Sequence, residues 1–578
     1  MPERTWVPAA IDLAAADRIA RDLDLSPALA RLLVARGLSD VDAARRYLQP
    51  ELGHLPSPFL MAGLERASER VVAAILEGQR VALYGDYDVD GVTSSSLLAA
   101  FLGHHGVTPR VYIPHRLREG YGLNHDAIDT LAEEGTQLLV TLDCGITAAD
   151  EIQRANEAGM DVVVVDHHTC PAELPPAYAT LNPHQPGCDY PEKVLAAVGV
   201  CFNLIVGVRK KLRDAGAYDG RFTEPNLREV LDLVALGTIA DMVPLTGVNR
   251  MLAWFGLREM QRVRRPGLRA LMEVAGVRPS RVSGQDVAFR LGPRINAAGR
   301  LDDASVGVRL LTATSSEAAR PLAERLDVAN GDRRRIEAEV FKEAVEQAEP
   351  MAAGAHVLVL HGAAWHAGVV GIVASKLVER FELPAVVIGE GGRGSARTAG
   401  ALHLYDALAS CAHHLVKFGG HRAAAGLRIE SAHVDAFRRD LDAAVARAKA
   451  AGVDATIPLE YDLDLDAGQI DLAFAKEVAR LEPFGVGNAE PTFRLLRLAV
   501  REHRVVGQHH LKLRLDGGGR PLDAIAFRFG DREPEVGRGG PLDLACHVEV
   551  SEFGGYERVE LRVRDLRVGA PLAEAVGA

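Results

Sequence analysis

The sequence predicts an α/β protein with a first domain built on a parallel sheet, a second α/β domain, a long helix that joins them, and a C-terminal β-barrel. Three observations support this prediction. Short apolar runs rich in β-branched residues alternate with helical patterns from residue 81 and again from residue 356. A helical pattern with a polar outer face fills residues 314–348. Beyond residue 454, apolar and polar residues alternate with a period of two.

Length and composition indicate a large globular protein. The chain has 578 residues, which at roughly 150 residues per domain suggests about four domains. Its 66 basic and 78 acidic residues give a net charge of −12, and 48% of its residues are hydrophobic. These values exclude a disordered or collagen-like chain. The acidic balance argues weakly against a nucleic-acid partner, although a basic groove can exist on an acidic protein.

Cysteine usage and hydropathy indicate the compartment. The six cysteines are scattered and form no CxxC pair, which favours reduced thiols in a cytoplasmic protein over a zinc ribbon. The first residues lack a basic region followed by an apolar core, so we expect no signal peptide. No run of about 18 apolar residues occurs, so we expect no membrane span.

The elements follow in chain order. Residues 1–55 are predicted to be a helical segment, because leucines recur at helical spacing before a proline-rich join at residues 50–58. The strands and helices of the first α/β domain, residues 56–312, are expected at 81–84, 93–103, 137–142, 148–158 and 160–165. Within this domain, residues 257–300 carry ten arginines against three acidic residues, a net charge of +7.

The second half of the chain has two further patterns. A connecting helix is expected at 313–350, the second α/β domain at 351–453 and the barrel at 454–578. Strands at 356–360 and 384–388 and helices at 368–380 and 434–450 define the second domain. Alternating runs separated by glycine-rich turns indicate a small antiparallel barrel or sandwich; they lie at 510–515, 542–550 and 558–564.

The strongest chemical signal is the segment from Tyr84 to Ser94. Asp86, Asp88 and Asp90 crowd the carboxyl end of its predicted strand, where open α/β sheets place their ligands. Because three carboxylates so close together repel one another, a cation is their natural partner. A solvated acidic turn and a calcium loop of the Asp-x-Asp-x-Asp-Gly kind are the alternatives.

The next two predicted strands end in the same way. One leads into Asp143, and the next leads into Asp166, His167 and His168. A single aspartate can be a helix cap, but acidic groups aligned at successive strand ends are harder to explain as helix caps. Asp241, a fourth acidic position, ends an apolar helical run. Carboxylates with one imidazole suit manganese or magnesium, with manganese favoured, and a bridging carboxylate suits in-line attack on phosphorus.

Histidine pairs by themselves carry little information in this chain. Three further pairs occur and are expected to be surface or core histidines: His104-His105, His413-His414 and His509-His510. Only His167-His168 follows an aspartate at a strand end.

These acidic motifs resemble motifs I to IV of the DHH phosphoesterase superfamily and, within it, the bacterial single-strand-specific 5′→3′ exonucleases. Other segments resemble that family too: 294–302, 394–397, 419–421 and 481–491. The resemblance runs from about residue 80 to 500 and implies a metal-dependent exonuclease that releases 5′-mononucleotides from single-stranded DNA in repair and recombination. It also implies a single-strand-binding protein and a helicase as partners.

The resemblance also implies a role for each motif residue. Asp88 and Asp143 would hold one Mn²⁺ ion, for which Mg²⁺ can substitute, with Asp86 nearby. A second ion would be held by Asp90, Asp143, His167 and Asp241, which makes Asp143 the bridge. Asp166 would orient its neighbours, and His168 would contact the scissile phosphate.

Residues 351–453 resemble the DHHA1 domain, which supplies substrate-binding groups. Ser395, Arg397, Gly420 and His421 suit a phosphate cradle, because glycine permits close approach and arginine binds phosphate bidentately. An ordinary tight turn is the alternative for residues 419–421. Arg294 and Arg300 of the basic segment are expected on the DNA backbone, with a solvated face as the alternative. The terminal barrel resembles the oligonucleotide-binding (OB) fold, which binds single strands.

Three other interpretations compete with a single-strand exonuclease. A phosphoesterase for very short oligonucleotides or nucleotides needs only two lobes, and the barrel and the basic segment argue against it. A non-catalytic DNA-binding relative would be expected to lose its carboxylates, which are all present here. An inorganic pyrophosphatase would not need residues 455–570.

Overall fold

The computed structural model describes residues 4–116, 118–120, 122–400, 402–451, 458–507, 509–553 and 555–569, without the side chain of Phe553. The chain divides into two compact units. The large unit comprises Pro56–Asp241 and Phe255–Ile457, and the small unit comprises Met1–Leu55, Met242–Trp254 and Pro458–Ala578. The expected domain boundary between residues 453 and 454 lies outside the described residues.

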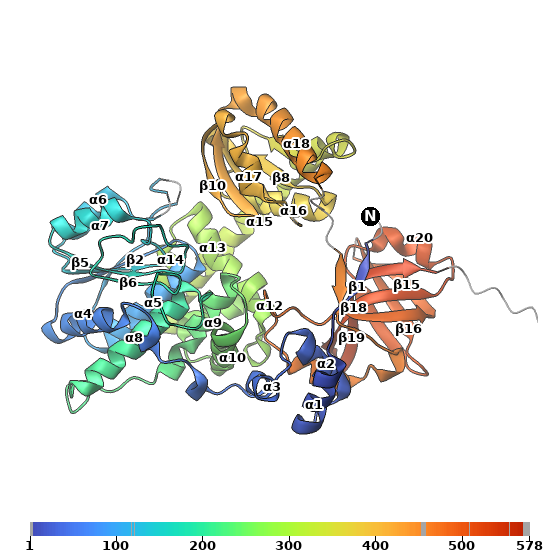
Figure 1. The fold of residues 1–578 in the computed structure, drawn as a ribbon, viewed down its shortest axis with the longest axis horizontal. Coiled ribbons are helices and arrows are strands. Elements are labelled where there is room, and N and C mark those ends of the chain that lie inside the picture. The colour runs from blue at the N-terminus through green and yellow to red at the C-terminus, as the bar shows by residue number, and fades with distance from the viewer. Residues whose placement is uncertain are drawn as a thin grey trace, which may run out of the picture. The chain divides into compact units, whose positions relative to one another are not determined.

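The first part of the large unit is built on a five-stranded parallel sheet with the strand order β3-β2-β4-β5-β6. Figure 1 labels three of its strands, β2, β5 and β6. Its strands are β2 (Val81–Gly85), β3 (Arg110–Tyr112), β4 (Leu138–Leu142), β5 (Asp161–Val165) and β6 (Ala179–Leu181). All residues of β2 and β4 are buried, as expected for a parallel sheet covered by helices. The predicted parallel sheet is confirmed.

Helices surround this sheet. Those that follow or precede its strands are α4 (Leu64–Glu77), α5 (Val89–His104), α6 (His125–Glu133), α7 (Ala149–Glu157) and α8 (Ala197–Asp214). A helical layer follows, made of α9 (Leu231–Ala240), α11 (Pro266–Ala275), α12 (Gly284–Asp286), the π-helical turn η5 (Val287–Leu291), α13 (Gly292–Leu301) and α14 (Ser305–Leu311). Central α5 packs against α8, α9 and α14, so most of its residues are buried.

The predicted connecting helix is confirmed as α15 (Ser316–Ala352), which is 37 residues long. It begins at the N-cap Ser315, whose hydroxyl accepts a hydrogen bond from the N–H of Ala318. Along its length α15 packs first against α11, α13 and α14 and later against α16 (Val370–Phe381). It therefore contacts both α/β parts of the large unit.

The second part of the large unit has a mixed sheet with the strand order β10-β11-β9-β8-β7. Its elements are β7 (Leu358–His361), β8 (Ala385–Ile388), β9 (Arg393–Arg397), α17 (Leu404–Ala409), β10 (Leu415–Gly420), β11 (Ala424–Ile429) and α18 (Val434–Ala450). Only β7 and β8 are parallel, and the other pairs are antiparallel. One face of the sheet packs on α17 and α18 and the other on α15 and α16, which confirms a second α/β domain.

The small unit combines three stretches of the chain. The N-terminal stretch supplies β1 (Trp6–Pro8), α1 (Leu13–Leu23), α2 (Pro27–Ala35) and α3 (Val41–Leu48), and the middle stretch supplies the start of α10 (Gly247–Arg262). The C-terminal stretch supplies β12 (Leu459–Tyr461), β13 (Leu463–Asp464), α19 (Leu472–Ala479), β14 (Phe493–Leu498), β15 (Val500–Val506), β16 (His510–Asp516), β17 (Pro521–Ala526), α20 (Glu533–Val536), β18 (Leu542–Phe553) and β19 (Tyr556–Val568). Strand β1 pairs with β12, so the N-terminal and C-terminal stretches are joined within one unit.

The predicted barrel is not closed in the described residues. The sheet runs β13-β14-β18-β19-β17-β16-β15, with β13 and β15 at its edges. Strands β14 and β15 are separated by Ala499 alone, and the chain bends there after a register shift between Leu495 and Leu498 and a positive φ of 56° at Arg497. One bent segment thus pairs with β18 at one end and with β16 at the other, which curls the sheet without joining its edges.

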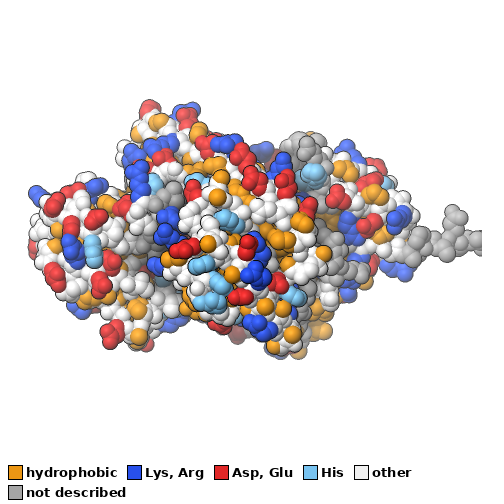
Figure 2. All heavy atoms as spheres, turned by 90° about the horizontal axis from the view of Figure 1, so that it is seen from above, with side chains coloured by type: hydrophobic (Ala, Val, Ile, Leu, Met, Phe, Trp, Pro, Cys, Tyr) orange, Lys and Arg blue, Asp and Glu red, His pale blue; other side chains and the backbone are white. Residues whose placement is uncertain are grey.

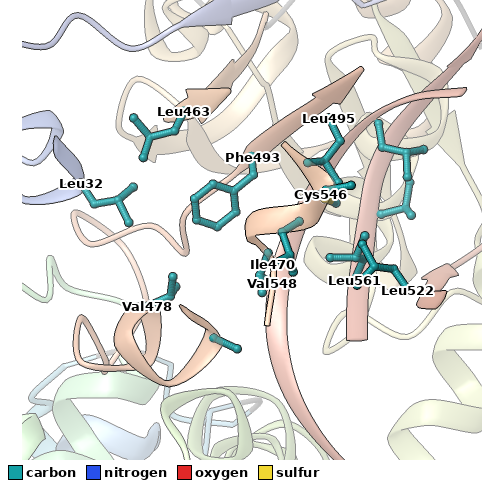
Figure 3. Packing of buried hydrophobic residues seen from close by; sticks show 14 of the residues in the cluster. Leu32, Leu463, Ile470, Val478, Phe493, Leu495, Leu522, Cys546, Val548 and Leu561 are labelled. Carbon is teal, nitrogen blue, oxygen red and sulfur yellow. The ribbon is translucent and has the colours of Figure 1, made fainter. Parts of the chain in front are cut away.

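The core of the small unit explains why its stretches stay together. Leu32 of α2 faces Leu463 and Phe493 of the sheet, and all three are buried (Figure 3). The loop 481–491, which resembles a family motif, holds this assembly through Asn488. Its side-chain oxygen accepts hydrogen bonds from Arg36 (3.2 Å) and Tyr47 (2.8 Å).

Surface charges agree with the composition. Acidic, basic and histidine side chains are interspersed over the face drawn in Figure 2. Among the described helices, none combines the length and apolar character needed to cross a membrane.

Candidate metal centre and phosphate-binding residues

Three strands of the parallel sheet end side by side. The register pairs Gly85 with Leu142 and Leu142 with Val165, so the residues that follow them are neighbours. The backbone continues the ladder one step further, since the N–H of Asp86 donates to the carbonyl of Leu142 and that of Asp143 to the carbonyl of Val165. The predicted juxtaposition of acidic groups at the strand ends is therefore present.

The loop after β2 folds tightly against the start of α5. Asp88 is the N-cap of this helix, and its Oδ1 accepts the N–H groups of Asp90 (2.9 Å) and Gly91 (3.2 Å). A Cβ atom on Gly91 would lie 2.4 Å from the carbonyl oxygen of Asp86, so only glycine fits there. The carboxylate of Asp90 is turned inward, where it accepts the N–H groups that begin α8.

Three overlapping groups of three potential ligands share this edge of the sheet, and one of them, Asp143 with His167 and His168, overlaps the two that matter most for a metal ion. Of these two, Asp86, Asp88 and Asp143 form one, and Asp90, His167 and Asp241 form the other. In each group the ligand atoms lie within 4.8 Å of one another.

His167 links the two groups. Its Nε2 lies 3.2 Å from Asp143 Oδ1, 3.9 Å from Asp90 Oδ2 and 3.8 Å from Asp241 Oδ2. Its Nδ1 lies 2.9 Å from the carbonyl oxygen of Leu195, so Nδ1 carries the proton and the lone pair of Nε2 faces the carboxylates. This is the orientation that a ligating imidazole requires.

The electrostatics of the cluster indicate a cation. Burial and then neighbouring carboxylates raise the pKa values of Asp86, Asp90 and Asp143 well above their usual range. Burial and Asp88 raise the pKa of Asp241 to about 7. Burial and then His168 lower the pKa of His167 to about 4, so its imidazole is neutral.

The donor set fits divalent ions. Among the described residues, the buried Oδ1 of Asp86 has no hydrogen-bond partner. Oxygen ligands with one neutral imidazole are those preferred by Mn²⁺, and Mg²⁺ accepts the carboxylates.

Asp166 lies behind the cluster. Its Oδ1 accepts the Nδ1–H of His168 at 2.7 Å. Burial raises the pKa of Asp166, but hydrogen bonds from His168 and Ile146 outweigh it and hold the pKa below its usual value. Burial lowers the pKa of His168, and the bond to Asp166 reverses this and raises it above normal. The Nδ1–H of His168 is therefore held by Asp166, and its Nε2 is left for another partner beside the carboxylates.

Arginines gather beside the acidic cluster. Burial and then repulsion from Arg116 and Arg333 lower the pKa of Arg300 to about 10. Burial and Arg116 also lower the pKa of Arg397. Arg300 donates to the carbonyl of Gly368 at 3.0 Å, next to α16 of the second α/β domain. The guanidinium groups of Arg116, Arg300 and Arg397 therefore lie close enough to repel one another, which is typical of an anion-binding site.

Arg116 was not predicted from the sequence. It follows β3 in a loop, its guanidinium lies 4.8 Å from the ring centre of Tyr87, and it lowers the pKa of Asp86. Only its position beyond a strand of the sheet could have indicated it.

Of the other predicted phosphate-binding residues, Ser395 lies beside Arg397, and the remaining three are less closely grouped with them. Ser395 and Arg397 lie on one face of β9, and both lie within 3.2 Å of where a Cβ on Gly371 would be. Gly420 and His421 lie at the turn between β10 and β11, with β11 between them and β9. Arg294 is tied to Asp327 (2.9 Å) and to the carbonyl of Arg290 and is not brought to this group by any described contact.

The segment 294–302 supports the loop after β2 through its backbone and small side chains. Asn296 accepts the N–H of Val89 at 3.1 Å, and a Cβ on Gly299 would lie 2.4 Å from the carbonyl oxygen of Tyr87. Just before α13, the π-helical turn η5 carries Phe289, whose side chain is exposed. Sequence periodicity gave no indication of this residue, because a π-turn shifts side chains out of helical register.

Comparison with known proteins agrees with this architecture. Residues 80–238 match the family described as "DHH family, N-terminal domain", residues 354–447 match "DHHA1 domain", and residues 461–565 match "RecJ OB domain". The single-stranded-DNA-specific exonuclease RecJ of Salmonella typhimurium is 37% identical over 94% of this chain and 96% of its own. The enzyme of the same name from Bacillus subtilis is 35% identical over 95% of this chain and 69% of its own.

Solved structures give the same result. The crystal structure of Thermus thermophilus RecJ in complex with Mn²⁺ matches with a TM-score of 0.84 and 31% identity, and it covers 99% of this chain and 81% of that one. Another RecJ structure, bound to manganese, matches with a TM-score of 0.59 and 35% identity over 67% of this chain and 95% of that one. The chain belongs to the RecJ family of the DHH/DHHA1 superfamily.

Proposed function

We propose that this protein is a metal-dependent exonuclease that degrades single-stranded DNA in the 5′→3′ direction and releases 5′-mononucleotides. The observation that carries this proposal is the shared edge of the sheet, where Asp143 lies within reach of both three-ligand groups and a cluster of arginines lies beside them. The names of the RecJ relatives support the substrate.

The carboxylates and His167 hold the metal ions in this proposal. Asp86 and Asp88 serve one ion, and Asp90, His167 and Asp241 serve the other, with Asp143 shared between them. Two Mn²⁺ ions held there, or Mg²⁺ in their place, would supply Lewis-acid chemistry for phosphodiester hydrolysis. The structures of relatives with Mn²⁺ and with Mg²⁺ support a divalent metal ion at this centre.

The chain's own groups position the strand. His168, held by Asp166, donates a hydrogen bond to the scissile phosphate from its raised-pKa imidazole. Arg116, Arg300, Ser395 and Arg397 bind the phosphate at the 5′ end, because an anion relieves the repulsion among the guanidinium groups and arginine binds phosphate bidentately.

The remaining predicted residues contribute around this core. Gly420 and His421 extend the phosphate cradle at the turn after β10. Arg294 contacts the DNA backbone only if its hydrogen bond to Asp327 breaks. Phe289 offers an exposed ring for stacking of a base. A cytoplasmic location and partnership with a single-strand-binding protein and a helicase in repair and recombination complete the proposal.

The test is a digestion time course with single strands labelled at either end, with and without a 5′-phosphate, beside a blunt duplex. We expect 5′-mononucleotides first, a preference for the 5′-phosphorylated strand, resistance of the duplex, and dependence on Mn²⁺ or Mg²⁺. Release from the 3′ end, or equal cutting of the duplex, would contradict the proposal. Hydrolysis of dinucleotides alone would favour a small-substrate phosphoesterase.

Arg397→Ala tests the cradle in the same assay. We expect it to blunt the preference for a 5′-phosphate by tenfold or more, because one charge-assisted contact contributes about 1.5–3 kcal/mol. Arg393→Ala is the matched control, since Arg393 is an exposed arginine four residues earlier on the same strand. Equal effects of Arg397→Ala and Arg393→Ala would show that Arg397 does not belong to the phosphate cradle.

A further inference from the structure

A second cluster of metal-ligating side chains lies on the DHHA1 domain, away from the residues discussed above. It joins the short turn η7 (Ala412–His414) to α18. Nε2 of His413 lies 3.5 Å from Asp440 Oδ2, and Nε2 of His414 lies 2.8 Å from the same oxygen. The three ligand atoms lie within 4.8 Å of one another.

We propose that His413, His414 and Asp440 form a zinc site that is separate from the exonuclease metal centre. Two imidazole nitrogens and one carboxylate are a ligand set typical of Zn²⁺, whereas Mg²⁺ prefers oxygen ligands alone. Such a set leaves a fourth position for water. His433, whose ring centre is 6.4 Å from that of His414, is a second source for that ligand.

The distances suit a tetrahedral ion. Zinc bonds of about 2.0–2.1 Å to nitrogen and 2.0–2.2 Å to oxygen place neighbouring ligand atoms roughly 3.3–3.5 Å apart. The distance from His413 to Asp440 already has this value. The distance from His414 to Asp440 must open by about 0.5 Å, which is accessible because the side chain of Asp440 is 52% exposed.

A simple histidine–aspartate hydrogen bond accounts for only part of the cluster. It explains His414, which is largely buried and meets the ring of Phe437 edge-on. It is weaker for His413, whose side chain is 64% exposed and whose Nε2 lies 3.5 Å from the same oxygen, while its ring packs on that of His414 at 4.1 Å between centroids. Two imidazole nitrogens and one carboxylate oxygen gathered around one point are what a shared ion requires.

A bound ion would fix the start of an edge strand. His414 immediately precedes β10, which has only β11 as a neighbour in its sheet. An ion held by His414 and Asp440 would tie the start of β10 to α18. The site would therefore stabilise the strand that leads to Gly420 and His421.

The test is a titration of the metal-free full chain with Zn²⁺, followed by calorimetry and by counting bound zinc after gel filtration. We expect wild type to bind one more zinc ion per chain than His413→Ala, and Asp440→Asn to weaken that ion at least tenfold. Zinc bound at the exonuclease centre is common to all variants and cancels in the comparison. His413→Ala is suitable because the exposed side chain can be removed without opening a core.

His403→Ala is the matched control. His403 pairs with Asp406 at 3.1 Å in the same domain, but it belongs to none of the three-ligand groups found in the described residues. We expect His403→Ala to bind as many zinc ions as wild type. Zinc should raise the melting temperatures of wild type and His403→Ala by more than it raises the melting temperature of His413→Ala. Equal stoichiometry in wild type and His413→Ala, or an equal loss in His403→Ala, would overturn the proposal.

Discussion

Oδ1 of Asp166 accepts a hydrogen bond from Nδ1–H of His168 at 2.7 Å, and the same oxygen accepts the backbone N–H of His167 at 2.7 Å. One buried carboxylate thus fixes the backbone of one imidazole residue and the ring of the next. His167 is oriented differently, through the carbonyl of Leu195. The two neighbouring histidines can therefore serve different partners, a metal ion for one and a phosphate for the other.

Asp166→Asn should lower both activity and metal affinity. Asparagine keeps the shape but removes the negative charge that holds His168 and the backbone of His167. Residues that orient metal-binding histidines typically contribute 10–100-fold to metal affinity or activity. We expect kcat to fall by a factor in this range and the Kd for Mn²⁺, measured by calorimetry, to rise by a similar factor. A change in kcat with an unchanged Mn²⁺ affinity would restrict Asp166 to positioning His168.

Asp143→Ala should have a larger effect, because Asp143 lies within reach of both ligand groups. We expect turnover to fall by several orders of magnitude while the fold, measured by circular dichroism, is retained. A variant with more than about a tenth of the wild-type rate, roughly 1.4 kcal/mol of barrier change, would exclude a bridging role.

Asp161→Asn is the matched control for Asp143→Ala. Asp161 begins β5, at the end of the sheet opposite Asp166, and its carboxylate pairs with Arg70 at 2.6 Å. We expect stability to decrease and kcat to remain near that of wild type. A comparable loss of kcat would mean that disturbance of the sheet, rather than loss of a ligand, explains the effect of Asp143→Ala.

The sequence predicted the parts of this protein that follow from local patterns. Aspartates after buried strands imply a cluster, because parallel strands end at one edge, and Asp86, Asp143 and Asp166 do lie there. The 37-residue helix α15 could also be predicted from a local pattern, because its apolar residues recur on one face.

Contacts between segments that are far apart in the sequence could not be predicted from local patterns. Arg116 reaches the cluster from a loop, and Leu32 packs on Phe493 across most of the chain. The open sheet depends on a bend at Arg497, where the residue has a positive φ that its identity does not favour. Neither feature could be predicted from periodicity.

Phe289→Ala should weaken binding of single-stranded DNA if the exposed ring stacks on a base. Stacking on an aromatic side chain contributes about 1–3 kcal/mol per base. We expect the Kd for a short oligonucleotide, measured by fluorescence anisotropy in Ca²⁺ to prevent cleavage, to rise about fivefold or more. Phe289→Trp should restore it. Equal losses on a normal strand and on an abasic strand would show that the ring does not stack.

Arg504→Ala should reduce the salt dependence of DNA binding. Arg504, Lys512 and Arg514 line a hollow of about 860 Å³ on the sheet of the small unit. Each phosphate neutralised on a single strand contributes about 0.7 to the slope of log K against log salt. We expect the slope to fall by about that amount. Arg480→Ala, an exposed arginine outside this hollow, should leave it unchanged, and an unchanged slope for both would exclude the hollow as a DNA contact.

His547 should make the small unit sensitive to acid. Its side chain is buried, with Nδ1 2.8 Å from the carbonyl oxygen of Pro491 and Nε2 3.2 Å from Nη1 of Arg564. Burial and then the cations of Arg562 and Arg564 lower the pKa of His547 from 6.5 to about 4. A proton on Nε2 would face Arg564 directly, so the folded state resists protonation.

The direction of the pH effect follows from this depressed pKa. Below pH 6.5 the unfolded chain binds a proton that the folded chain binds only near pH 4, so stability is complete above pH 6.5 and is lost as the pH falls toward 4. The loss between pH 7.5 and 5 is about 2 kcal/mol for one such group. We expect His547→Gln to remove this part of the pH dependence, and His509→Gln, on an exposed histidine of the same unit, to retain it.

Urea unfolding at several pH values checks this expectation. Of the three tryptophans, Trp6 and Trp254 belong to the small unit and Trp365 to the large one. Fluorescence in a Trp365→Phe background therefore reports on the small unit alone. Parallel pH profiles for His547→Gln and its His547-containing parent would show that His547 does not titrate between pH 6.5 and 4, and that another buried group causes any acid sensitivity of this unit.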